Sequence, residues 1–127
     1  MMQAIFCRFQ IVGVHFHPSA TDVFERSRHR HAFHFEVVLN AAGLDNDDEL
    51  TPVRFRQFCV DQFGSSTSVF DFDDQQAIGI AQWLGKVITE KFDGRGVRVA
   101  VSEDGENGAV VTYGLESVYD EEDSTSG

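Results

Sequence analysis

The chain has 127 residues, of which 42% are hydrophobic and 24% charged, and its formal net charge at pH 7 is −11. This length predicts one globular domain, and the acidic charge argues against a nucleic-acid partner, because such binding needs a basic surface that displaces counterions. The sequence contains no apolar run of membrane-spanning length and no secretory signal pattern, and two cysteines cannot form the disulfide framework of a secreted mini-domain. We therefore expect a cytoplasmic protein with no membrane association.

Two long strands are predicted in the first 39 residues. Apolar residues alternate with polar ones from Ile5, which is the period-two pattern of a half-buried strand that continues towards His15. Residues 16–28 lack sustained alternation and read as a connecting loop. From His29 to Leu39 the odd positions are rich in aromatic and β-branched residues, which strands favour. The two strands are expected to form an antiparallel hairpin.

Two helices are predicted next. Thr51 as N-cap and Pro52 at the first helical position open a short helix, which Gly64 can close. Asp73, with Gln76 three residues later, resembles a capping box at the start of a longer helix. This second helix carries one apolar stripe at three-four spacing, formed by Ala77, Ile80, Ala81, Leu84, Val87 and Ile88.

The last two predicted strands complete the fold. They run from Val97 to Glu103 and from Ala109 to Tyr113, joined by a turn-rich segment. The order ββααββ predicts an α+β fold with an antiparallel sheet and two helices on one face. We place the single domain at residues 1–115, followed at 116–127 by an acidic tail that is expected to be solvated and disordered.

All five histidines lie between positions 15 and 34. Antiparallel pairing brings His15, at the end of the first strand, beside His29 and His31 at the start of the second. Three neutral imidazoles with a vacant fourth position are the arrangement of catalytic zinc, so these residues are the candidate ligands. Two alternatives remain open: His17 and His34 compete as ligands, and a His-x-His pair is also common at an exposed strand edge.

These residues resemble the signature of the 6-pyruvoyltetrahydropterin and 6-carboxytetrahydropterin synthase family. That family has a lone histidine ending its first strand and a His-Gly-His opening its second, which correspond here to His15 and to His29-Arg30-His31. The resemblance implies a T-fold of ββααββ order, Zn²⁺ held by the three histidines, and a homo-oligomer, a hexamer, with active sites between neighbouring subunits. It also implies that Glu103, at the end of a late strand, binds the amide and amino edge of a pterin, which a carboxylate can do with two hydrogen bonds.

The chain departs from the family pattern at two places. The usual catalytic cysteine, four residues before the first histidine of the pair, is replaced by Glu25. A variant of the family with a Glu-x-x-x-His-x-His pattern is associated with cleavage of the side chain to 6-hydroxymethyl-dihydropterin. The usual Asp-His pair between the two helices is missing, because no histidine follows His34, although Asp71 or Asp73 is expected near the same place.

The functional prediction is a zinc-dependent pterin lyase that acts on 7,8-dihydroneopterin triphosphate or a close relative, with Glu25 as the catalytic proton carrier. The alternative is a non-catalytic T-fold protein that retains the zinc site and binds a pterin or purine, or serves in assembly. A third hypothesis is an acidic adaptor that binds a partner through residues 120–123.

Overall fold

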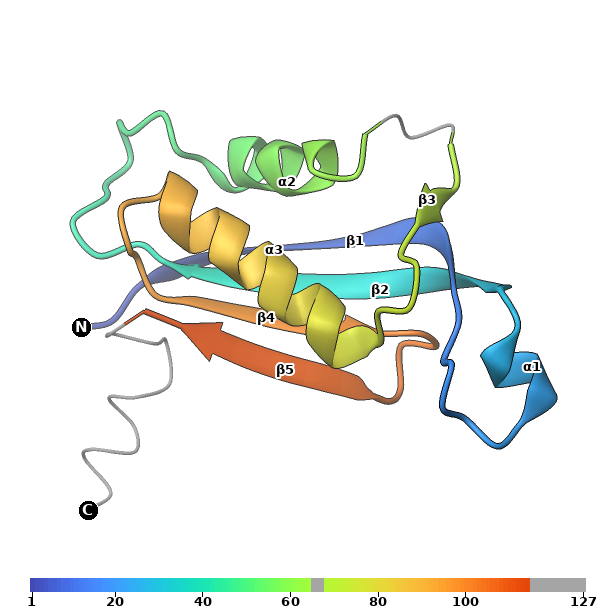
Figure 1. Cartoon of the computed structure of the whole chain (residues 1–127). Coiled ribbons are helices and arrows are strands. Elements are labelled where there is room, and N and C mark those ends of the chain that lie inside the picture. Colours follow the sequence, from blue (N-terminus) through green and yellow to red (C-terminus); the bar gives the residue numbers. More distant parts are fainter. Residues whose placement is uncertain (65–67, 115–127) are drawn as a thin grey trace, which may run out of the picture.

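The computed structural model describes residues 1–64 and 68–114 of the chain. Within these ranges the elements are, in order, β1 (Ala4–His15), α1 (Val23–Arg26), β2 (His29–Asn40), α2 (Pro52–Asp61), β3 (Phe70–Asp71), α3 (Ala77–Lys91), β4 (Val97–Ser102) and β5 (Gly108–Tyr113). The strands form one sheet in the order β3-β1-β2-β4-β5. Helices α2 and α3 lie across one face of it, so the α+β class is confirmed (Figure 1).

The predicted hairpin forms with the predicted register. β1 and β2 pair antiparallel over their whole lengths, from Ala4 opposite Asn40 to His15 opposite His29. β4 pairs antiparallel with β2, and β5 with β4. The end of β1 and the start of β2 therefore lie side by side, and both carry histidines there.

The core lies between the sheet and the two long helices. Most odd-numbered residues of β1, β2 and β4 are buried, and Phe9 stacks on Phe35 with ring centroids 4.9 Å apart. The helices contribute fully or almost fully buried side chains that cover this face, among them Phe55, Cys59, Ile80, Leu84 and Ile88. Each such side chain contributes roughly 1.5–3 kcal/mol by leaving water, which fixes the sheet under the helices.

The sheet is mixed, so the prediction of a purely antiparallel sheet is wrong. β3 has only two residues and pairs parallel with β1, with Phe70 opposite Gly13 and Asp71 opposite Val14. The predicted 16–28 loop also contains a helical turn, α1, capped by the carboxylate of Asp22. Such short elements depend on tertiary contacts, and their sequences carry no repeating pattern of their own. The larger elements keep the expected order of two strands, two helices and two strands, and the T-fold itself stays a prediction.

The two helix starts have different outcomes. Thr51 caps α2 as predicted, because its side-chain oxygen accepts a hydrogen bond from the Arg54 N–H at 3.2 Å. The capping box at Asp73 is wrong: α3 begins at Ala77 with Gln76 as N-cap, and Gln76 makes no side-chain capping bond. Asp73 instead adopts a left-handed conformation with φ of 55° and belongs to the connection before the helix.

Two further predictions concern the ends and surface of the chain. No helix in residues 1–64 and 68–114 is long and apolar enough to cross a membrane. The domain end at 115 and the acidic tail at 116–127 lie outside the residues that the structure describes.

Candidate metal centre

Three histidines converge where β1 ends and β2 begins. His15 and His29 are direct partners across the hairpin, and His31 lies two residues further along β2, on the same face. The ligand atoms of the three side chains all lie within 4.8 Å of one another. Among the described residues, these three form the group that can hold a metal ion, so the predicted cluster is confirmed as an arrangement.

Backbone carbonyls fix the orientation of two of the rings. His15 Nδ1 lies 2.9 Å from the Gln75 carbonyl oxygen, and His29 Nδ1 lies 2.8 Å from the Ser27 carbonyl oxygen. A carbonyl only accepts, so each Nδ1 carries the proton and donates it, which leaves a lone pair on Nε2. Metal-binding histidines characteristically donate their second ring N–H in this way.

Of the three histidines, His15 gives the strongest support for a metal site. Its side chain is only 1% exposed, and its buried Nε2 has no hydrogen-bond partner of adequate geometry. A buried polar atom left without a partner costs about 1–3 kcal/mol. A metal ion bound to Nε2 would remove that penalty, so the donor set and its burial fit a divalent metal ion.

His31 completes the donor set in its neutral form. Burial lowers the pKa of His31, and the charges of the neighbouring histidines add to this effect, whereas Glu103 opposes it. A lowered pKa keeps the imidazole unprotonated at neutral pH, and the neutral ring is the form that binds metals.

Glu103 lies against the histidines. It follows β4 directly, and its Oε1 lies 3.1 Å from His15 Nε2 while its Oε2 lies 3.5 Å from His31 Nε2. The sequence predicted a pterin-binding role for this carboxylate and gave no sign of the contact with the histidines. Only the folded β4–β5 connection brings it there, so sequence spacing alone could not have found it.

A cavity of about 220 Å³ opens beside the cluster and is lined by His15, His17, Glu25, His29, Gln76 and Glu103. Glu25 comes from α1, whose position is held by a 2.7 Å hydrogen bond from the His17 backbone N–H to the Glu25 carbonyl oxygen. The structure therefore brings the predicted catalytic carboxylate into the same cavity as two of the predicted ligands.

The two competing histidines, His17 and His34, do not belong to the three-histidine cluster. His17 lines the cavity without joining the cluster. His34 points from the other face of β2 and packs beside Gly105, whose added Cβ would lie 3.6 Å from the imidazole ring. Of the alternatives left open by the sequence, neither histidine replaces a member of the cluster.

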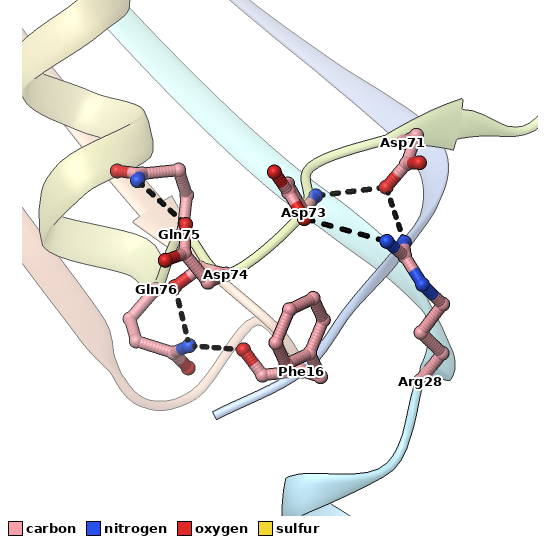
Figure 2. Close-up of polar contacts among 7 residues, drawn as sticks. All are labelled: Phe16, Arg28, Asp71, Asp73, Asp74, Gln75 and Gln76. Carbon is pink, nitrogen blue, oxygen red and sulfur yellow. Dashed lines mark hydrogen bonds and ion pairs between the residues drawn. The ribbon is translucent and has the colours of Figure 1, made fainter. Parts of the chain in front are cut away.

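The segment that supplies the Gln75 carbonyl is hydrogen-bonded to residues 16 and 28, which directly follow β1 and directly precede β2 (Figure 2). Arg28 donates to Asp71 at 2.7 Å and to Asp73 at 3.3 Å. On its other side the segment is held by Gln76, whose amide donates to the Phe16 carbonyl oxygen at 2.9 Å. Residues 71–76, which we call the 71–76 brace, thus connect these neighbouring residues to the three-histidine cluster through the Gln75 carbonyl.

Asp71 and Asp73 have a structural role in this brace. The Asp73 backbone N–H and the Arg28 guanidinium both donate to Asp71, and they hold its pKa below the usual range. A carboxylate with a lowered pKa is a weaker base at neutral pH. Neither aspartate lines the cavity, so these residues are poor substitutes for the Asp-His pair that the sequence lacks.

Several positioning groups were missed from the sequence. The carbonyl oxygens of Ser27 and Gln75 orient two rings, and any residue type could supply a backbone carbonyl.

Comparison of the chain with models of protein families finds no matching family, and a search of curated proteins finds no match.

Proposed function

We propose that this protein is a zinc-dependent lyase that cleaves the side chain of a pterin, 7,8-dihydroneopterin triphosphate or a close relative. The observation that carries the proposal is a cluster of three imidazoles, two of them oriented by backbone carbonyls, beside a cavity that those two rings line together with two glutamates. The choice of a pterin rests on the resemblance to 6-pyruvoyl- and 6-carboxytetrahydropterin synthases in the His15 and His29-Arg30-His31 pattern.

His15, His29 and His31 would hold the metal. Imidazole donors suit zinc, copper, iron and nickel, and the cluster contains no thiolate. Zinc bound there would polarise a hydroxyl oxygen of the pterin side chain and make its O–H more acidic. Loss of that proton would let the adjoining C–C bond break, and a proton added to the carbon left on the ring would give 6-hydroxymethyl-dihydropterin, with the rest of the side chain released as an aldehyde. In the two rings bound to carbonyls, Nδ1 is already engaged, so Nε2 is the nitrogen that would bind the metal.

Glu25 would move the proton. Its side chain lies at the cavity, on a helical turn that is capped and tied to His17. A carboxylate within reach of a metal-bound substrate can serve as general base. The other nearby carboxylates on that side, Asp71 and Asp73, are bound to Arg28.

A second copy of the chain would complete the site. The cavity of about 220 Å³ is smaller than the roughly 300–1,000 Å³ typical of small-molecule pockets. β5 is an outer strand of the sheet in the described part of the chain, and an outer strand can pair with another subunit. We therefore propose a homo-oligomer, with a hexamer suggested by the resemblance.

One observation favours a second candidate function, a non-catalytic protein that keeps the metal site and binds a pterin or purine. No histidine follows His34, and the aspartates nearest the expected Asp-His position are engaged in the 71–76 brace. Under this candidate the ligand would bind and remain unchanged.

The test begins with protein purified without chelator, whose metal content is measured by mass spectrometry. Zinc-loaded protein is then incubated with 7,8-dihydroneopterin triphosphate, and the pterin products are weighed. We expect 6-hydroxymethyl-dihydropterin from the wild type and at least about 100-fold slower formation by Glu25→Gln, since general acid–base catalysis contributes about 10²–10⁴-fold.

The matched control is Glu90→Gln, which removes the same charge from an exposed position on α3. It should react at the wild-type rate. Tight pterin binding without a product would support the second candidate, and zinc-loaded protein that neither binds nor converts the pterin would contradict both.

A further inference from the structure

The carboxylate of Glu103 divides its two oxygens between two histidines of the cluster. Oε1 lies 3.1 Å from His15 Nε2, and Oε2 lies 3.5 Å from His31 Nε2. The His15 nitrogen nevertheless lacks a hydrogen bond, because its ring donates from Nδ1 to the Gln75 carbonyl, so that Nε2 and the carboxylate oxygen are both acceptors. A buried nitrogen therefore faces a carboxylate oxygen at close range with no proton well placed between them.

The spacing of these atoms matches that of ligands around one metal ion. Two ligands at about 2.0–2.1 Å from a tetrahedral zinc lie about 3.3 Å from each other. The observed separations of 3.1 and 3.5 Å fall on either side of that value. The three imidazole donors, all within 4.8 Å of one another, form the rest of the set.

We infer that Glu103 is the fourth protein ligand of this centre, which makes it a three-histidine, one-carboxylate site. The inference rests on the proposed metal centre and adds a ligand to it. A carboxylate is a hard oxygen donor that suits Mn²⁺ as well as zinc, whereas imidazole alone favours zinc, copper, iron and nickel. Glu103 thus widens the range of divalent metals that the site can hold.

The loop after Glu103 is organised to hold the carboxylate in place. Asp104 accepts hydrogen bonds from the backbone N–H groups of Glu106 at 2.8 Å and Asn107 at 2.9 Å. Ser102 Oγ accepts from the Gly105 N–H at 2.9 Å. These bonds fix the backbone on both sides of Glu103, so its side chain is presented to the histidines by a formed turn.

The test compares Glu103→Gln with Glu106→Gln. Both variants remove one carboxylate from the same loop, but Glu106 is exposed and lies outside the cavity beside the histidines. Zinc affinity is measured by competition with a chromophoric chelator, and Mn²⁺ affinity by the electron paramagnetic resonance signal of the free ion. A third readout is the visible spectrum of the Co²⁺-loaded protein, which reports the ligands directly.

We expect Glu103→Gln to lower zinc affinity by at least about 10-fold, because even outer-shell partners of a metal are worth about 10–100-fold. Mn²⁺ affinity should fall by a larger factor, and the Co²⁺ spectrum should change. Glu106→Gln should match the wild type in all three measurements. Glu103→Asp, which keeps a shorter carboxylate, should fall between the wild type and Glu103→Gln.

Glu103 is 39% exposed and lies outside the strands, so its variants should fold, which thermal unfolding of the metal-free proteins checks. If Glu103→Gln and Glu106→Gln bind zinc and Mn²⁺ equally well, the inference is overturned, while zinc binding by the wild type would keep the three-histidine centre. A wild-type chain that binds no divalent metal would overturn both.

Discussion

Replacing Gly13 with alanine tests whether the 71–76 brace orients His15 for metal binding. Gly13 lies in β1 between two partners, His31 on β2 and Phe70 on β3. An added Cβ would collide with the ring of Phe72 and lie 2.9 Å from the Phe70 carbonyl oxygen. The backbone of β3 cannot yield without moving away from β1, and the brace that follows it must move too.

The expected cost has two parts. Forcing a methyl group into this packed site should lower the free energy of unfolding by about 1–3 kcal/mol. Displacing the Gln75 carbonyl from His15 should also lower zinc affinity by about 10-fold, at the low end of the 10–100-fold effect of outer-shell partners, because the carbonyl is shifted and not removed.

Urea unfolding of the metal-free protein and chelator competition for zinc measure the two effects separately. The control is Ile88→Val, a buried change on α3 that should cost about 0.5–1.5 kcal/mol without altering zinc affinity. If Gly13→Ala loses stability yet binds zinc as tightly as the wild type, the brace does not orient His15 and this reasoning fails.

Three further predictions address the ligands, the core and the loop beside Glu103. His29→Ala should lower zinc affinity by at least about 100-fold in the chelator assay, since losing a ligand exceeds the outer-shell effect, and His34→Ala on the opposite face should leave the affinity unchanged. Phe55→Ala should lower the free energy of unfolding by about 3–5 kcal/mol in urea, because this ring on α2 is fully buried in the core. The backbone N–H groups of Asn107 and Glu106 lower the pKa of Asp104 to about 2 from its ordinary 3.8. Asp104 therefore stabilises the fold fully above about pH 4, and this contribution is lost as the pH falls through about 2. Unfolding free energies of the wild type and Asp104→Asn should accordingly converge on acidification, and a difference that is constant with pH would contradict the assignment.

The long elements could be predicted because apolar residues recur in them at the regular spacing of a strand or a helix. Alternation along β1 and β2 leaves one solution for the hairpin, since a slip of one residue would turn every buried phenylalanine to solvent. The same register brings His15 opposite His29, so the three-histidine cluster followed from strand geometry. Thr51 and Pro52 act locally, and the start of α2 was therefore also predictable.

The missed features depend on contacts between distant parts of the chain. β3 exists because Phe70 and Phe72 pack beside β1 at Gly13, and nothing in two residues signals a strand. Asp73 is a residue type that often caps helices, but its carboxylate accepts a hydrogen bond from Arg28, 45 positions away, and its backbone is left-handed. The approach of Glu103 to the histidines likewise needs β4 to be docked against β2 first.

Glu103 has two proposed roles, binding the metal and binding the pterin, and both need the same carboxylate. The resemblance to pterin synthases assigns its carboxylate to the N–H edge of a pterin, whereas its position 3.1 Å from His15 and 3.5 Å from His31 assigns it to the metal. One carboxylate cannot satisfy both in full, because each role uses its lone pairs in a different direction. Under the proposed lyase function, a pterin that forms hydrogen bonds with Glu103 would draw this carboxylate away from the metal. The coordination position left by the carboxylate would then be open to an oxygen of the pterin side chain. Binding of the substrate would then open the site at which it reacts, and Glu25, which contacts neither His15 nor His31 as an ion pair, would stay available for the proton.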